Sequence, residues 1–170
     1  MLRALDSEQM GNDRAVDIGG GLMLERAALE FFVGALNDEG EGPFLACDSP
    51  AGRYRAIFED DGATGYFYAL DIALGQEPIV DALQIYSVAQ VTDRDKANRV
   101  NIAWSSDGAA ASLLINGYAH ADFDFNRQRG WCRSGFPPPS AQSPWDQQSH
   151  AWNSEADALL SRCRRARSAA

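Results

Sequence analysis

Short segments rich in branched and aromatic residues, separated by tight-turn signals, occupy the middle of the chain. Asp61-Gly62, Asp107-Gly108 and Asn116-Gly117 are pairs that tolerate the positive φ angles of two-residue hairpin turns. Strands are therefore expected at residues 54–60, 65–71, 99–105 and 119–125, with further strands at 43–48, 83–88, 110–115 and 130–134. This spacing predicts an α+β, mainly β fold: a curled antiparallel meander of about eight strands, either barrel-like or a sandwich.

The hairpin around Asn116-Gly117 carries apolar residues on both of its faces. A two-residue turn would place Leu113 on the same face as His120, and Phe123 on the opposite face. A sheet that is apolar on both faces must be covered on both sides. We therefore expect the sheet to be covered by its own curvature or by helices.

Helical elements are expected at the two ends of the chain. Residues 22–36 place apolar side chains at spacings of three, four and seven, which favours a helix, while a strand through 29–33 is the competing interpretation. Ser154 can cap a C-terminal helix over 154–166, with acids in its first turn and arginines in its last. Three consecutive prolines make 136–150 an extended connection between sheet and helix.

The chain is expected to fold as a single domain over residues 22–166. Residues 1–21 lack periodicity and are interpreted as a flexible lead-in, and 167–170 as a tail. No apolar run could span a bilayer, and the N-terminal residues do not resemble a signal peptide. Cys47, Cys132 and Cys163 fit neither a disulfide framework nor a zinc site, and Cys132 is expected to be a buried apolar side chain. A cytoplasmic protein is predicted.

The composition adds a strongly acidic charge. Fifteen basic and 24 acidic residues give a net charge of -9 at pH 7, and the pI is near 4.6. This balance disfavours nucleic acids and anionic membranes as partners and favours a basic protein. The charge is concentrated, because residues 37–71 hold eight acids against two arginines, a net charge of -6.

Aromatic side chains accompany these acids. Tyr66 and Tyr68 alternate on a predicted strand, and tyrosines flanked by acids are typical anchors of a protein-binding surface. The three consecutive acids at 59–61 lack the spacing of a calcium loop, and an acidic hairpin tip of purely structural role is their alternative interpretation. We expect a basic partner to contact Glu59, Asp60, Asp61, Tyr66, Tyr68 and Asp71.

His120, Asp122 and Asp124 are the strongest candidates for acid–base chemistry. They alternate along one predicted strand, so their side chains project from the same face. A histidine beside a carboxylate can act as a general base, and all three could bind a divalent metal. The alternative is a solvated polar face, since the other histidine, His150, falls in the predicted connection. No nucleotide-binding loop or nucleophile elbow occurs in the sequence, and no cofactor is expected.

Five strings are distinctive in combination: FEDDGATGYFYALD (58–71), IVDALQIYSVAQVTD (79–93), WSSDG (104–108), LLINGYAHADFDF (113–125) and GWCRSGFPPP (130–139). Together they resemble a family of small bacterial proteins known only as a domain of unknown function. The resemblance covers roughly residues 43–139 and leaves out the first 40 residues. It implies a small, β-rich bacterial protein and supplies no catalytic residues.

In character, a small acidic β-rich protein without a catalytic signature is similar to the immunity proteins that bacteria encode beside secreted toxins. The sequence thus leads to the hypothesis of a non-enzymatic binding protein that neutralises a cognate toxin. Two alternatives stay open. One is a small metal-dependent hydrolase using His120, Asp122 and Asp124, and the other is a structural subunit or homodimer that completes a sheet edge by self-association.

Overall fold

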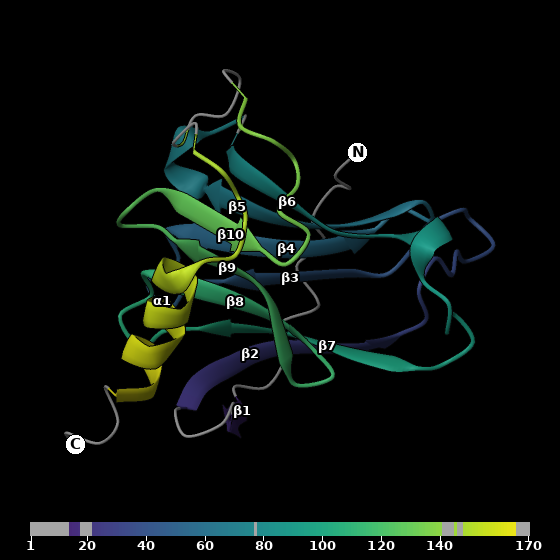
Figure 1. The fold of residues 1–170 in the computed structure, drawn as a ribbon, viewed down its shortest axis with the longest axis horizontal. Coiled ribbons are helices and arrows are strands. Elements are labelled where there is room, and N and C mark those ends of the chain that lie inside the picture. Colours follow the sequence, from purple (N-terminus) through teal and green to yellow (C-terminus); the bar gives the residue numbers. More distant parts are fainter. Residues whose placement is uncertain (1–13, 18–21, 77, 141–144, 146–147, 166–170) are drawn as a thin grey trace.

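The protein is a sandwich of two antiparallel sheets, with one helix against the outside of the first sheet (Figure 1). The computed structural model describes residues 14–17, 22–76, 78–140, 145 and 148–165. The sheets are not closed into a barrel. The mainly β fold predicted from the sequence is therefore confirmed, in its sandwich form.

Strand order follows the sequence closely within each sheet. The first sheet has the order β1-β2-β7-β8-β9-β10 and the second has the order β3-β4-β5-β6. Among the described strands of the first sheet, β2 and β7 are the pair whose connection leaves the sheet and returns to it, and the second sheet forms within that connection. The elements are β1 (Arg14–Asp17), β2 (Leu22–Phe31), β3 (Phe44–Asp48), β4 (Tyr54–Asp60), β5 (Thr64–Asp71), η1 (Ile72–Leu74), β6 (Ile79–Ser87), η2 (Val88–Gln90), β7 (Asn98–Trp104), β8 (Ala110–Ile115), β9 (Tyr118–Asp124), β10 (Arg129–Cys132) and α1 (Ser154–Arg165).

The segment expected to form an N-terminal helix is a strand. β2 pairs with β1 on one side and with β7 on the other, and Ala27 and Phe31 are buried in the core with Leu29 packed against it. Hydrogen bonds to a neighbour on each side outweigh the local spacing that favoured a helix. The competing strand interpretation is correct, and β1 lies within the predicted lead-in, whose other residues lie outside the described part.

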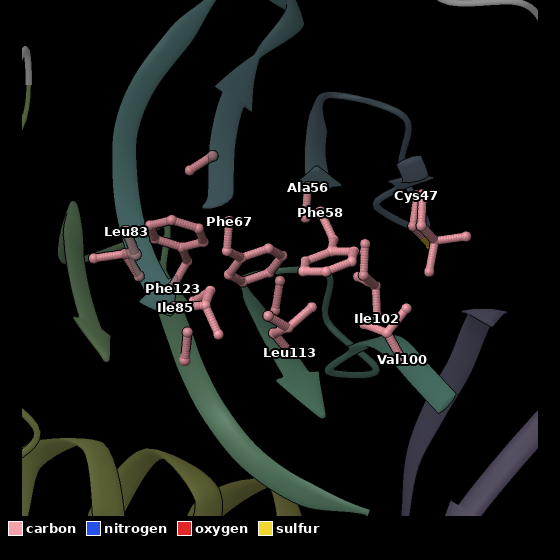
Figure 2. Close-up of a cluster of buried hydrophobic side chains, with 14 of the residues drawn as sticks. Cys47, Ala56, Phe58, Phe67, Leu83, Ile85, Val100, Ile102, Leu113 and Phe123 are labelled. Carbon is pink, nitrogen blue, oxygen red and sulfur yellow. The ribbon is translucent and has the colours of Figure 1, made fainter. Parts of the chain in front are cut away.

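The core fills the space between the two sheets. Figure 2 shows Phe58 and Phe67 of the second sheet pointing toward Ile102 and Phe123 of the first, and all four side chains are fully buried. The ring centroids of Phe67 and Phe123 lie 4.9 Å apart. Large aromatic side chains from facing sheets bury much apolar area, which is the main stabilising contribution in such a sandwich.

A β-bulge in the β8–β9 hairpin decides which side chains reach this core. Asn116 and Gly117 both have positive φ angles, 52° and 80°, as the predicted turn requires. The register shifts between Leu113 and Leu114, so Leu113 shares the core with Phe123. The predicted separation of these two residues on opposite faces is wrong, because the extra residue of a bulge reverses the alternation beyond it.

Helix α1 covers the outer face of the first sheet (Figure 1). Its Ala156 and Leu159 are buried against Ala110 of β8 and Trp131 of β10. Since both faces of this sheet carry apolar residues, one packs on the second sheet and the other on the helix. The predicted covering of both faces of this sheet is therefore present.

The cap of α1 is one residue earlier than predicted. The side-chain oxygen of Asn153 accepts hydrogen bonds from the backbone N–H groups of Glu155 (2.9 Å) and Ala156 (3.3 Å). Asn153 thus satisfies the first amides of the helix, which the sequence had assigned to Ser154. Asparagine and serine are equally good caps, so composition alone did not separate them.

The segment after β10 joins the two sheets along one side of the sandwich. The N–H of Gln84 on β6 donates to the carbonyl of Phe136 (2.9 Å), and the hydroxyl of Ser134 donates to the carbonyl of Gln84. Farther along, the N–H of Cys132 donates to the carbonyl of His150 (2.8 Å). This connection therefore pairs with the outer edges of both β6 and β10.

Candidate functional site

Asp60 organises one end of the sandwich, where the 33–43 loop meets the β4–β5 turn. One carboxylate oxygen accepts hydrogen bonds from the N–H of Gly34 (2.7 Å) and the hydroxyl of Tyr86 (2.7 Å), and the other accepts from the N–H of Gly62 (2.8 Å). Asp60 has 0% exposure. The structure thus places this predicted partner contact inside the protein, where it holds the loop, the turn and β6 together.

Glycines allow this close approach of loop and turn. A Cβ atom at Gly42 would lie 1.8 Å from the carbonyl oxygen of Asp60, and one at Gly34 would lie 2.6 Å from a methyl group of Val88. Gly34 also has a φ of 71°, a conformation that glycine adopts without strain. The position of the loop against the turn therefore depends on both glycines.

The loop and the turn bring acidic residues from separate parts of the sequence to one surface. Asp38, Glu39 and Asp61 are exposed, and Glu41 is half-buried. Leu36, beside Gly62 in the turn, is 50% exposed. These acids and Leu36 are called the acidic end below.

Asp61 has a defined position in this surface. Its carboxylate accepts hydrogen bonds from the N–H groups of Ala63 (2.9 Å) and Thr64 (2.8 Å). Partial burial acts to raise the pKa of Asp61, but these hydrogen bonds outweigh it and lower the pKa below its ordinary value. Asp61 is therefore a fixed negative charge at neutral pH.

The outer face of the second sheet carries the predicted tyrosines. Tyr66 and Tyr68 are half-buried and stack with their ring centroids 5.6 Å apart. Glu59 is the partner of Tyr66 on β4 and is only 4% exposed. Burial, followed by the charge of Glu59, raises the pKa of Tyr68, so its phenol is neutral at physiological pH. Tyr66 and Tyr68 are called the tyrosine face.

Asp71 is separated from the acidic end by the length of β5. Its carboxylate pairs with the guanidinium of Arg53 at 3.2 Å and also accepts the N–H of Ala73 at the start of η1. The charge of Asp71 is therefore balanced locally. The structure brings Asp61 close to the tyrosine face and leaves Asp71 at the other end of the strand.

His120, Asp122 and Asp124 alternate along β9, but each has a different environment. Asp122 is fully buried and accepts a hydrogen bond from the hydroxyl of Ser112. Asp124 accepts the N–H of Arg127 at 3.0 Å, in the turn after the strand. Burial, followed by the charge of Arg133 directly after β10, lowers the pKa of His120. Within the described part of the chain, no group of three His, Cys, Asp or Glu side chains could hold a metal ion.

Asp122 is expected to make stability depend on pH. Burial raises the pKa of Asp122 to about 7, and the hydrogen bond from Ser112 and the charge of Arg133 offset this only in part. The native state therefore binds a proton more tightly than the unfolded state, whose ordinary pKa is 3.8, and stability should fall as pH rises from 3.8 toward 7. Asp122→Asn should remove this dependence of the unfolding free energy on pH, called the pH slope, and should stabilise the protein at pH 8 by about 1 kcal/mol.

Urea unfolding at pH 5 and pH 8 measures this effect. Asp93→Asn is the matched control, because Asp93 is exposed and forms an ion pair with the exposed Lys96 on the same loop, away from Asp122. This variant should keep the pH slope of the wild type. An unchanged pH slope in Asp122→Asn would contradict the assignment of a raised pKa to Asp122.

His150 and Asp81 form a buried pair that the sequence did not indicate. Nε2 of His150 lies 3.2 Å from a carboxylate oxygen of Asp81, and Nδ1 lies 2.8 Å from the carbonyl oxygen of Pro137. Because both ring nitrogens face acceptors, the site fits a protonated imidazolium. The two residues are 69 positions apart, and no motif connects them.

The cysteines have no reactive environment in the described residues. Cys47 and Cys132 are buried and not disulfide-bonded. Burial raises the pKa of the Cys132 thiol, which is opposite to what a nucleophile requires. The side chain of Cys163 lies outside the described part. Within the described residues, no helix is long and apolar enough to cross a membrane.

Comparison with known proteins identifies relatives without an assigned activity. The sequence model of one family, described as an uncharacterized protein conserved in bacteria (DUF2251), matches residues 38–161. An "Uncharacterized protein" of Haemophilus influenzae (strain ATCC 51907 / DSM 11121 / KW20 / Rd) is 45% identical over 93 residues. The alignment covers 55% of this chain and 58% of that relative, so the chain spans less than two thirds of its length. No solved structure matches the chain significantly.

Proposed function

Because the chain belongs to the bacterial family DUF2251, whose description assigns no activity, we propose a function from the chemistry of its surface. The protein is a non-enzymatic binding protein that blocks a basic partner through the acidic end and the tyrosine face. The partner is a cognate toxin, and the protein acts as its immunity protein in the cytoplasm.

The acidic end carries this proposal. Hydrogen bonds to Asp60 fix the loop and the turn, so the exposed acids and Leu36 are held in place before a partner arrives. An exposed apolar side chain among fixed negative charges suits a basic protein surface with an apolar centre. A rigid surface also loses little conformational entropy on binding.

The tyrosine face adds contact area next to the acidic end. Thr64 ends the turn that contains Asp61, and Tyr66 follows two residues later on β5. Stacked tyrosines contribute large contact areas with few rotatable bonds, and they are common among the residues that dominate binding energy. A toxin that acts on nucleic acid or nucleotides has a basic substrate groove, which such a surface would occupy.

Neither alternative gains support from a specific observation. A hydrolase would need substrate to reach Asp122, which is fully buried beside the helix-covered Trp131. For self-association by strand addition, the connection after β10 already pairs with β6 and β10, which leaves β1 and β3 as the other outer strands of the two sheets. A homodimer through these strands or through another surface is an outcome that sedimentation would detect.

Charge reversal at the acidic end tests the proposal. We expect the tagged protein to recover the product of a neighbouring toxin-like gene as a stoichiometric complex at low salt. Asp38→Lys combined with Glu39→Lys should weaken that complex about tenfold or more, chiefly by slowing association. Titration calorimetry and stopped-flow kinetics measure the two effects.

Glu155→Lys is the matched control, because it reverses an exposed charge on α1. It should leave affinity for the partner within about twofold of wild type, as expected for a charge outside the interface. Failure to recover any stoichiometric partner would refute the proposal. Equal losses of affinity in the Asp38→Lys, Glu39→Lys double variant and in Glu155→Lys would also refute it.

A further inference from the structure

Arg133, directly after β10, is held between two aromatic rings. Its guanidinium carbon lies 3.6 Å from the ring centroid of Trp152 and 4.9 Å from that of Tyr118. Its Nε donates a hydrogen bond to the carbonyl of Ala119 (3.1 Å). Arg133 is exposed, and Tyr118 beside it is 55% exposed. The cation is therefore fixed in place and open to solvent.

The acids of α1 near Arg133 are engaged by other residues. A carboxylate oxygen of Asp157 accepts the indole N–H of Trp152 (2.9 Å), and Glu155 pairs with Arg129 (3.5 Å). Among the described residues, Arg133 has no carboxylate within ion-pair distance. The guanidinium of Arg133 is instead held by two aromatic rings and a carbonyl oxygen.

We propose that Arg133, Tyr118 and Trp152 form a second binding surface, which takes a carboxylate from an acidic segment of a partner protein. The planar fork of a guanidinium matches the two oxygens of a carboxylate. Stacking on Trp152 and the hydrogen bond to Ala119 restrict the side chain before binding, so little rotamer entropy is lost. Arginine, tyrosine and tryptophan are also the residues most enriched among interface hot spots.

Charge favours an isolated carboxylate over a polyanion at this surface. The excess of acids over the whole chain repels a nucleic acid, while a single carboxylate needs only the one cation. The exposed ring of Tyr118 offers apolar contact to a side chain next to that carboxylate. This inference uses none of the residues of the acidic end or the tyrosine face, so it stands independently of the proposed function.

A peptide titration tests the inference on the full-length protein. The probes are acetyl-Leu-Glu-Leu-amide and the isosteric acetyl-Leu-Gln-Leu-amide, followed through the Nε1–H signal of Trp152 and the Nε–H signal of Arg133 in ¹⁵N spectra. We expect saturable shifts with the glutamate peptide. The glutamine peptide should bind at least about tenfold more weakly. Arg133→Gln should lose the binding. Arg94→Gln, which changes an exposed arginine on the loop before β7, should retain it.

Three results of the peptide titration would overturn the inference. They are equal binding of the two peptides, unchanged binding by Arg133→Gln, and the lack of any saturable shift. A single-stranded oligonucleotide that binds Arg133 more tightly than the glutamate peptide would also overturn it, in favour of a nucleic-acid site. An unchanged thermal midpoint of Arg133→Gln confirms that the fold is retained.

Discussion

Asp60→Ala is expected to destabilise the protein by about 3 kcal/mol or more, because it removes the buried acceptor of three partly buried hydrogen bonds. The N–H groups of Gly34 and Gly62 and the hydroxyl of Tyr86 would lose their partner where Asp60 is fully buried. An unpaired buried donor retains its full desolvation cost, so the three losses accumulate. Equilibrium urea unfolding followed by tryptophan fluorescence measures the change.

Two further variants separate this hydrogen-bonding role from a general effect of lost charge. Asp60→Asn keeps one acceptor oxygen and should show an intermediate loss of stability. Asp61→Ala removes the adjacent acid, which is exposed and accepts hydrogen bonds from amides of its own turn, and should cost about 1 kcal/mol or less. Similar losses for Asp60→Ala and Asp61→Ala would contradict the interpretation.

Asp60 and Asp61 show why the candidate surface was only partly predictable. They are adjacent acids, and a charge count treats them alike. The alternation of β4 points Asp60 inward, and two of its three donors come from Gly34 and Tyr86, each 26 residues away. Composition located the acidic region of the chain, but contacts distant in sequence decided which carboxylates face solvent.

The strands were predictable wherever a turn signal fixed them. The pair Asn116-Gly117 adopts the expected φ angles, and the flanking strands lie within two residues of their predicted bounds. The prediction of β2 failed because its partner β7 is distant in sequence and supplies hydrogen bonds that no local pattern encodes. The bulge after Leu113 was missed for a related reason, since cross-strand packing sets the register.

The pair formed by His150 and Asp81 lies beyond any sequence-based prediction. Each residue alone has an ordinary context, a loop histidine and a strand aspartate. Only the path of the connection after β10, back across the edge of β6, brings them together. Gly130 permits that approach, since a Cβ there would lie 2.7 Å from the carboxylate of Asp81.

Loss of this pair is the second large effect that we expect. Asp81→Asn should destabilise the protein by about 3 kcal/mol at pH 6, because it leaves the imidazolium of His150 buried without its counter-ion. Burial acts to lower the pKa of His150, but the hydrogen bond and charge of Asp81, with the Pro137 carbonyl, outweigh it and raise the pKa. The pair joins the connection to β6, so amide exchange at Gln84 should accelerate in the variant.

The pH dependence of this effect has a definite sign. A histidine whose pKa is raised by folding stabilises the native state fully below its ordinary pKa of 6.5 and loses that contribution as pH rises through the raised value. The stability difference between wild type and Asp81→Asn should therefore shrink above pH 6.5. Because the Asp122 contribution falls over the window from 3.8 to 7, the comparison is cleanest in an Asp122→Asn background. A difference that stays constant from pH 6 to pH 9 would show that His150 does not hold the proton.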